Sequence, residues 1–213
     1  MKLLVFSDVH GNLPALKAML EHAGTVDGYI CLGDVVNYGP WSDECVDVIK
    51  ALPNCVYIEG NHEVYFLTGV YPGKNIVAKT FFDFCYPKFT ARNQIKDLPK
   101  NYELGGFQFS HTILNRYIYP DTILELDGNY VIGHSHHQFK IEQPPYYLYN
   151  PGSVGQNRKY INVINYMTLD TDSMKFSMQN LLYDEMLIIN EMRARNYPKL
   201  CIDYYNEKMR LKN

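Results

Sequence analysis

Seven residues of the metal-binding types Asp, His and Asn lie just behind short apolar runs of this 213-residue sequence. They follow five such runs, the first at Leu3–Phe6 and the last at Tyr130–Ile132. The seven are Asp8, His10, Asp34, Asn61, His111, His134 and His136. Carboxylate, imidazole and amide ligands without a thiolate favour Mn, Fe, Zn or Ni over a structural zinc site. This ligand set exceeds the need of one tetrahedral ion and favours two ions about 3.5–4 Å apart that share a carboxylate.

The spacing inside the clusters predicts that their side chains converge. Residues two apart on an extended segment project to the same side, so Asp8 and His10 are expected to reach one ion. For the same reason, His134 and His136 are expected to face one cavity. Glycine precedes three of the clusters, at positions 33, 60 and 133, where it lets the backbone turn sharply beside an ion.

Alternating strand and helix patterns in the first third of the chain are expected to position these residues. Strands are predicted at Leu3–Phe6, Tyr29–Leu32 and Val56–Ile58. One helix is predicted from Leu13 to Gly24, and a second, which Ser42 caps, before Pro53. Repeated strand–helix–strand units predict a parallel sheet, and open α/β sheets place their sites at the carboxyl ends of the strands.

The rest of the chain predicts a second sheet. Residues 62–97 are rich in aromatic side chains and have a helical pattern. Short strands with turns between them then follow, and a second, partly antiparallel sheet is expected from them. These strands are Phe107–Phe109, Tyr130–Ile132, Phe139–Ile141, Tyr147–Tyr149, Ile161–Leu169 and Lys175–Met178. The chain returns to helix from Tyr183, with a break at Pro198. We expect one α/β domain over residues 1–213, with two packed mixed sheets and helices outside.

Composition narrows the class of protein. Apolar residues make up 46% of the chain, charged residues 20%, and the net charge is −3, which argues against stable nucleic-acid binding or membrane association. The five cysteines are widely spaced and never form a CxxC pair, which favours reduced thiols and a cytoplasmic location. No apolar run is long enough for a signal peptide or a membrane helix. Self-association into a homo-oligomer remains open.

Five motifs occur in a fixed order between residues 8 and 136: DVH, GDVVNYG, GNHE, a lone His after a strand, and GHSH. In this order they resemble the signature blocks of the calcineurin-like metallophosphoesterases. The run NPGSVGQ at 150–156 is similar to a turn in the small bacterial and archaeal members, which are often described as related to diadenosine tetraphosphatases and prokaryotic protein phosphatases. The resemblance covers nearly the whole chain and implies an αββα sandwich.

The resemblance also implies a role for each site residue. It assigns Asp8, His10 and His136 to a first metal ion, Asp34 to both ions, and Asn61, His111 and His134 to a second. His62 is not a ligand in the family and would donate a proton to the leaving group. The implied reaction is hydrolysis of a phosphate ester by a water molecule that the two ions activate.

The second motif departs from the pattern of the eukaryotic-type protein phosphatases, which carry Asp and Arg where this chain has Asn37 and Tyr38. The missing Arg favours phosphodiesters or nucleotide anhydrides, because a diester needs less cationic charge than a monoester. Asn37, Tyr38 and the nearby Arg158 are candidate substrate-binding residues for a phosphorylated small molecule or nucleotide. The alternatives are a phosphomonoesterase, a serine/threonine protein phosphatase, and a non-catalytic scaffold of the same fold.

Four other residues keep simpler interpretations. Glu63 either orients His62 or a ligand, or only ties down its own loop. His22 is expected to be exposed on a helix, and His137 to lie outside the inner site. Ser153 does not fit the G-x-S-x-G pattern of a nucleophile, so we expect it in a tight turn at one edge of the site.

Overall fold

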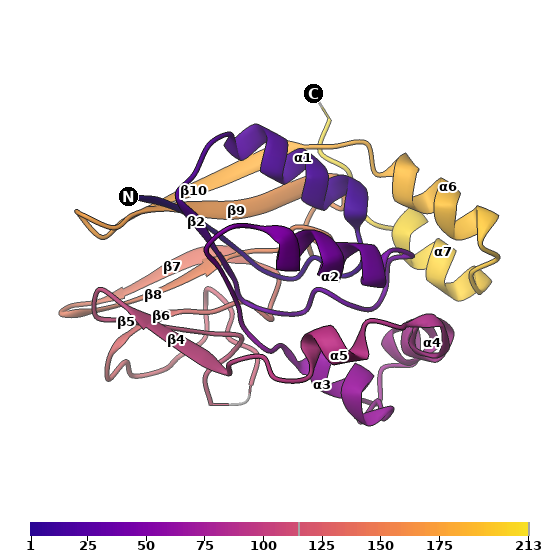
Figure 1. Cartoon of the computed structure of the whole chain (residues 1–213), viewed down its shortest axis with the longest axis horizontal. Coiled ribbons are helices and arrows are strands. Elements are labelled where there is room, and N and C mark those ends of the chain that lie inside the picture. The colour runs from indigo at the N-terminus through magenta and orange to yellow at the C-terminus, as the bar shows by residue number, and fades with distance from the viewer. Residues whose placement is uncertain (115, 213) are drawn as a thin grey trace.

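Two five-stranded β-sheets form the centre of the computed structural model, which describes residues 1–114 and 116–212 (Figure 1). The first sheet has the order β10-β9-β1-β2-β3. Its strands are β1 (Lys2–Phe6), β2 (Gly28–Cys31), β3 (Cys55–Tyr57), β9 (Val163–Asp170) and β10 (Lys175–Leu182). Strands β1, β2 and β3 are parallel, as expected, whereas β9 and β10 run antiparallel to their neighbours.

The second sheet has the order β4-β5-β6-β8-β7. Its strands are β4 (Asn101–Leu104), β5 (Phe107–Ser110), β6 (Asn129–Val131), β7 (Gln138–Gln143) and β8 (Tyr146–Pro151). Strands β5, β6 and β8 are parallel in the middle, and antiparallel β4 and β7 form the edges. The expected α/β fold with two packed mixed sheets is therefore confirmed.

One expectation about the strands is wrong, and one strand was not predicted. The strands at 163–170 and 175–182 belong to the first sheet, where β9 pairs with β1 in the register Leu3↔Leu169. The sequence pattern of a strand indicates which of its faces is buried but not which strand it pairs with. Here β1 and β9 are separated by most of the chain. The short strand β4 was not predicted: it has only four residues, and none of them is fully buried.

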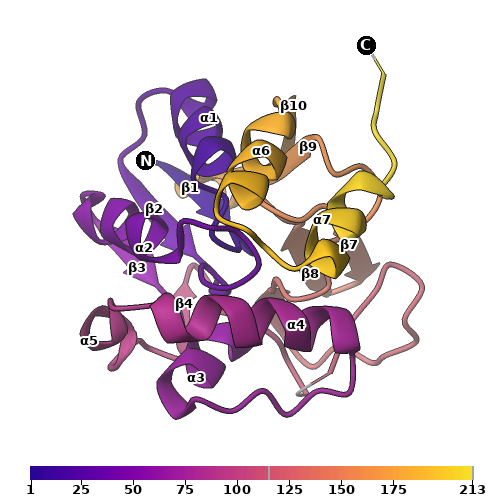
Figure 2. The same ribbon diagram turned by 90° about the vertical axis from the view of Figure 1, so that its right-hand side faces the viewer.

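Helices cover the outer face of the first sheet and one end of the molecule (Figure 2). They are α1 (Leu13–Ala23), α2 (Ser42–Ala51), α3 (Asn61–Thr68), α4 (Ile76–Cys85), α5 (Arg92–Ile95), α6 (Met186–Ala194) and α7 (Lys199–Asn206). Helix α4 packs on α7, and α7 on α6. Gly24 ends α1 as predicted. Ser42 does not cap α2: it is the first helical residue, and its Oγ accepts a hydrogen bond from the backbone N–H of Asn37 at 3.0 Å.

Alternate residues of β1 feed two different parts of the core. Leu4 and Phe6 point into the layer shared with α1, α2 and α6, whereas Val5 packs between the two sheets against residues such as Phe109. The outer face of the second sheet packs against Ile118 and Leu126, which come from the chain between β5 and β6. No helix of the described ranges is long and apolar enough to cross a membrane.

Candidate active site

The seven predicted ligands follow β1, β2, β3, β5 and β6, as the sequence indicated: six lie in loops, and Asn61 is the first residue of α3. Three of these strands belong to the first sheet and two to the second, so the site is shared by both sheets. The sheets are linked there by side chains. The backbone N–H of His134 donates to Oδ2 of Asp8 at 3.1 Å, and His111 Nδ1 donates to the carbonyl of Leu32 at 2.8 Å.

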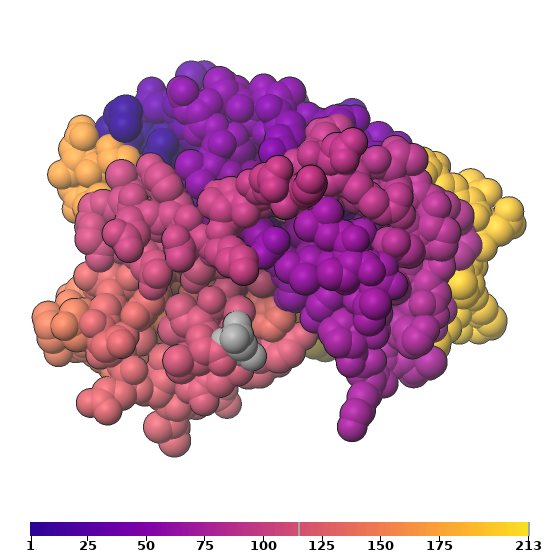
Figure 3. All heavy atoms as spheres, turned by 60° about the horizontal axis from the view of Figure 1, so that its bottom comes forward, coloured from indigo at the N-terminus to yellow at the C-terminus, as the bar shows by residue number. Residues whose placement is uncertain are grey.

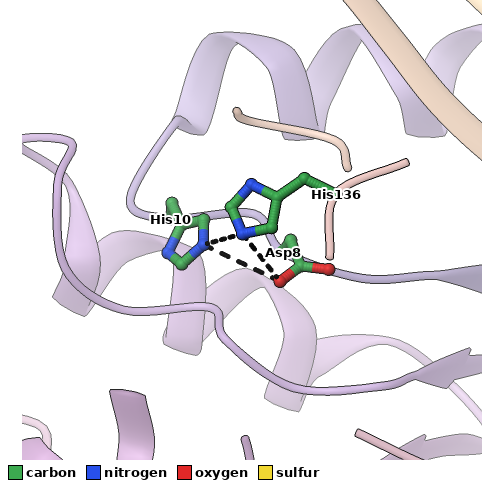
Figure 4. A group of neighbouring side chains, drawn as sticks. All are labelled: Asp8, His10 and His136. Carbon is green, nitrogen blue, oxygen red and sulfur yellow. Dashed lines mark hydrogen bonds and ion pairs between the residues drawn. The ribbon is translucent and has the colours of Figure 1, made fainter. Parts of the chain in front are cut away.

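The first group of ligands is Asp8, His10 and His136 (Figure 4). Oδ1 of Asp8 lies 3.3 Å from Nε2 of His136 and 3.8 Å from Nε2 of His10. The two Nε2 atoms lie 3.1 Å apart. All three side chains are buried, and their ligand atoms point toward one another.

The second group is built around His111. Its Nε2 lies 3.2 Å from Oδ2 of Asp34, 3.0 Å from Oδ1 of Asn61 and 3.1 Å from Nδ1 of His134. The Asp34 carboxylate also lies within 4.8 Å of ligand atoms of His10 and His62. Asp34 therefore stands between the two groups, in the place where a carboxylate can be shared.

The donor chemistry of the first group fits a cation. Nδ1 of His10 and Nδ1 of His136 face the carbonyl oxygens of Val36 at 3.2 Å and Gln156 at 2.8 Å, so each Nδ1 carries the proton. Each Nε2 therefore presents a lone pair toward the other. Oδ1 of Asp8, which points at the same spot, has no hydrogen-bond partner within the described chain. Buried acceptors that face only one another are stabilised by a positive charge between them, which a bound cation would supply.

Burial and nearby charges set the protonation of the four candidate ligand histidines. It lowers the pKa of His134 to about 3, and the charge of His111 acts in the same direction. Burial also lowers the pKa values of His10 and His136 well below the ordinary range. His111 differs: burial disfavours its charge, but the carboxylate of Asp34 outweighs burial and raises its pKa to about 10. Three of the four ligand histidines are therefore neutral and ready to bind a metal.

Five of the seven ligands have a left-handed backbone. The φ angles are 56° at Asp8, 50° at His10, 55° at Asp34, 68° at His134 and 59° at His136. Only a few per cent of residues other than Gly adopt positive φ. Asp8 and His10 do converge, but the expectation that they do so along an extended segment is wrong, since the backbone is left-handed at both residues. The two histidines of GHSH belong to different groups, His136 to the first and His134 to the second, which is the division that the family resemblance implied.

The loops after β2 and β3 touch backbone to backbone. A Cβ atom on Gly33, which has φ +96°, would lie 2.5 Å from the backbone nitrogen of Gly60. A Cβ atom on Gly60 would lie 2.3 Å from the backbone nitrogen of Asp34. Gly60 itself is extended, so close approach rather than its own dihedral angle requires glycine there. This contact brings Asp34 beside the start of α3, where Asn61 and His62 stand.

Glu63 is a buried clamp on these two loops. Its Oε2 accepts hydrogen bonds from the backbone N–H groups of Asp34 and Gly60, both at 2.8 Å. Its Oε1 accepts from Val35 at 2.8 Å and from the Tyr57 hydroxyl at 3.0 Å. Burial raises the pKa of Glu63, and the backbone N–H groups oppose the shift. Of the two interpretations, the contacts favour orientation of the loop that carries a ligand.

His62 is held from both sides. Its Nδ1 lies 3.0 Å from the side-chain nitrogen of Asn37, and its Nε2 lies 3.9 Å from Oδ2 of Asp34. The backbone N–H of His62 donates to Oδ1 of Asp34 at 2.8 Å. Burial lowers the pKa of His62, with a partial opposing effect of Asp34. Asn37 is fully buried and contacts His62, although its position in the sequence suggested substrate binding.

A cleft of about 560 Å³ opens beside the site. It lies between the α3–α4 segment and the segment after β5, which appear as the purple and pink flanks of the face in Figure 3. His62, His134, Tyr38 and Arg158 line it. Further tyrosines of the lining are Tyr65, Tyr71, Tyr117 and Tyr204. Of the candidate substrate-binding residues, Tyr38 and Arg158 therefore face a space of the size of a small organic ligand.

The model of the calcineurin-like phosphoesterase family matches residues 1–184. The chain belongs to the calcineurin-like phosphoesterases. It is 31% identical over 223 residues to the uncharacterized protein MJ0912 of Methanocaldococcus jannaschii, with 84% of this chain and 87% of the relative covered. Family membership shows a metal-dependent hydrolase, and it confirms the resemblance found in the motifs.

Solved structures share the fold of this phosphoesterase. A metallophosphoesterase from Sphaerobacter thermophilus is 26% identical, with a TM-score of 0.83 over 97% of this chain and 98% of the other. The hypothetical protein PH1004 from Pyrococcus horikoshii OT3 is 18% identical, with a TM-score of 0.81 over 96% and 97% of the two chains. These likenesses confirm the fold class.

The remaining polar residues of the phosphoesterase lie mostly where they were expected. His22 is exposed on α1, where Nδ1 lies 2.6 Å from the hydroxyl of Tyr166. The His137 ring packs edge-on against Tyr119, away from both ligand groups. Ser153 donates from Oγ to the carbonyl of Asp8 at 2.7 Å, so it fastens the turn to the first ligand loop.

Two residues near the site escaped the sequence reasoning. Gln156 binds His136 through its carbonyl oxygen, and its side chain contacts Tyr204 and Tyr205 of α7. Tyr204 reaches the cleft from the far end of the chain. The NPGSVGQ motif pointed to Gln156, but no pattern in the helical tail distinguishes Tyr204 from the other tyrosines.

Proposed function

We propose that this phosphoesterase uses two divalent ions to hydrolyse a phosphodiester or a nucleotide anhydride. The observation that carries the proposal is the pair of ligand groups on either side of Asp34. Asp8, His10 and His136 would hold one ion, and Asn61, His111 and His134 the other. When bound, the ions activate a water molecule and offset negative charge on the phosphoryl oxygens; Mn, Fe, Zn and Ni all suit this ligand set.

His62 is the proton donor in this proposal. It lines the cleft and contacts Asn37 through Nδ1, so its Nε2 side remains for the site. The proton would pass from Nε2 to the oxygen of the leaving group as the P–O bond breaks. General acid catalysis of this kind contributes about 10²–10⁴-fold to the rate. Geometry alone would also admit His62 as a third ligand beside His10 and Asp34, and mutagenesis separates these roles.

Replacing His62 with Gln tests the assignment. As a proton donor, His62 can be removed without loss of metal, so metal content should stay near that of wild type while turnover falls by about 10²-fold or more. As a ligand, His62 would be required for metal content. Asp34→Asn is the matched control, because a shared carboxylate should be needed for both ions. Metal content is measured by mass spectrometry and turnover with bis-p-nitrophenyl phosphate.

The preference for diesters rests on the modest cationic charge of the cleft. Among the described residues, Arg158 and Arg116 are the arginines that line it. Tyr38 occupies the position at which the eukaryotic-type protein phosphatases carry an Arg. A diester carries one negative charge at phosphorus, whereas a monoester carries nearly two at neutral pH. Comparing bis-p-nitrophenyl phosphate with p-nitrophenyl phosphate tests this. Faster turnover of the monoester in the presence of Mn²⁺ would reverse the preference.

A non-catalytic scaffold of the same fold is the rival of another class. The chain retains every ligand and His62, and the buried acceptors around Asp8 favour an ion over a purely structural role. Phosphorylated small molecules or nucleotides are the substrates that the cleft volume of about 560 Å³ would accept. A metal-supplemented screen of mono-, di- and dinucleotide phosphates that shows no turnover with any ion would favour the scaffold.

A further inference from the structure

Arg158 is a cation of the cleft that has no acidic partner within 4.0 Å in the described ranges. It is half-buried, and it lines the cleft together with His62 and His134, which belong to the metal site. The guanidinium is therefore close enough to act on an anion that binds between them.

Tyr204 of α7 holds this arginine in place. Nη1 of Arg158 donates to the Tyr204 hydroxyl at 2.8 Å. The hydroxyl in turn donates to Oε1 of Gln156 at 3.2 Å. Since one hydroxyl accepts from the arginine and donates to the amide, its orientation is determined by both partners. The other N–H groups of the guanidinium fork have no carboxylate to satisfy them in the described part of the chain.

Gln156 connects this arginine to the metal site. Its carbonyl oxygen accepts the Nδ1–H of His136 at 2.8 Å, and its Nε2 donates to the hydroxyl of Tyr205 at 3.1 Å. The turn that carries Gln156 is fastened to the first ligand loop, because the backbone N–H of Gly155 donates to the carbonyl of Asp8 at 3.0 Å. One short segment therefore fixes both a metal ligand and the arginine.

We propose that Arg158 binds a non-bridging oxygen of the substrate phosphate and that Tyr204 is the positioning residue that orients it. A planar guanidinium matches two oxygens of a tetrahedral phosphate, which a Lys ammonium cannot do. The helical tail thereby becomes part of the phosphate-binding apparatus, although it lies far from the motifs in sequence. This inference rests on the proposed function, and it identifies which residue meets the phosphate.

Inorganic phosphate is the probe, because its binding can be measured without turnover. Its Kd for the Mn²⁺-loaded full chain is determined by calorimetry, with metal content checked for every variant. Arg158→Met should weaken phosphate binding by about 10- to 100-fold, the value of a hydrogen bond to a charged group. Arg158→Lys keeps the charge without the fork and should give an intermediate Kd. It also serves as the informative variant if the Met variant folds poorly.

Tyr204→Phe tests the positioning role. It removes one hydroxyl and should weaken phosphate binding by about 3- to 10-fold without loss of metal. In the double variant with Arg158→Met, it should have no further effect, because Tyr204 acts only through the arginine. Tyr197→Phe is the matched control: that hydroxyl contacts Cys85 Sγ at 3.3 Å outside the cleft, so the phosphate Kd should stay unchanged.

Two results would overturn the inference. One is a phosphate Kd within twofold of wild type in Arg158→Met that still holds its metal. The other is an effect of Tyr204→Phe that adds fully to that of Arg158→Met. The proposed function fails differently: a wild-type protein that binds phosphate through Arg158 but hydrolyses none of the screened esters retains the inference and loses the function.

Discussion

Replacing Glu63 with Gln tests whether its carboxylate holds the loop that carries Asp34. The two side chains have nearly the same shape, but Gln offers an oxygen and an NH₂ group where Glu63 offers two oxygens. Glu63 accepts five hydrogen bonds between 2.8 and 3.3 Å, all from buried donors. Both of its oxygens are therefore in use, and an NH₂ group in place of either one leaves buried donors without an acceptor.

The magnitude follows from the donors that lose an acceptor. If the amide oxygen of Gln takes the place of Oε1, the NH₂ group faces the N–H groups of Asp34 and Gly60, which Oε2 meets at 2.8 Å. A buried donor without a partner costs about 1–3 kcal/mol, so the two together should lower the free energy of unfolding by about 2–6 kcal/mol. Relief of this conflict moves the Asp34 loop, so metal affinity should fall too.

Urea denaturation of the metal-free protein measures the free energy of unfolding, and mass spectrometry measures the metal content of the loaded protein. Glu191→Gln is the matched control, because this carboxylate pairs with Arg195 at 2.7 Å on the helix surface. Such an exposed pair is worth about 0.3–0.5 kcal/mol. A loss below about 1 kcal/mol in Glu63→Gln, with full metal content, would refute the clamp.

Three further changes are predicted. Asn37→Asp places a carboxylate about 3 Å from Nδ1 of His62, so it should raise the pKa of His62 by about one to three units. The alkaline limb of the pH–rate profile should move to higher pH by the same amount, and an unmoved limb argues against His62 as the acid. In the metal-free protein the pKa of His111 is about 10, and burial raises the pKa of Asp8 to about 7, so at pH 7 His111 is protonated and Asp8 partly so. Metal binding should therefore release between one and two protons at pH 7, which calorimetry in buffers of different ionisation enthalpy detects, and affinity should rise with pH. Gly155→Ala would put a Cβ 1.8 Å from the carbonyl oxygen of Val9, so it should lower Tm and metal content together. Gly106→Ala is the control: there is open space around this residue but its φ is +77°, so the variant should lower Tm and leave metal content intact.

That the seven predicted ligands lie together was predictable because strand ends are local features. Each ligand follows an apolar run directly, and the parallel order of β1, β2 and β3 brings the loops to one edge. The sequence also indicated two separate clusters around a shared carboxylate, and the structure places Asp34 between two groups of ligand atoms. Assignment of each residue to its ion and the choice of ion remain predictions.

Features that depend on distant partners were not predictable. The pairing of β9 with β1 joins segments at opposite ends of the chain, and nothing in either pattern specifies the other. Glu63 left two interpretations open because its partners are backbone N–H groups of another loop, which carry no sequence signal. Tyr204 is one of 19 tyrosines, and only the fold shows that it meets Arg158.

The strained ligand loops explain why so many buried hydrogen bonds surround the site. Left-handed backbone at a residue other than Gly costs about 1–3 kcal/mol, and five ligands adopt it. Such loops would relax unless fixed contacts opposed them, and two residues without any ligand role supply these contacts. Glu63 binds the N–H groups beside Asp34, and Ser153 binds the carbonyl of Asp8. The two contacts act on different loops, one of which carries the shared Asp34. Loss of the Ser153 contact should therefore disturb mainly the first group of ligands, whereas loss of the Glu63 contact should disturb both groups.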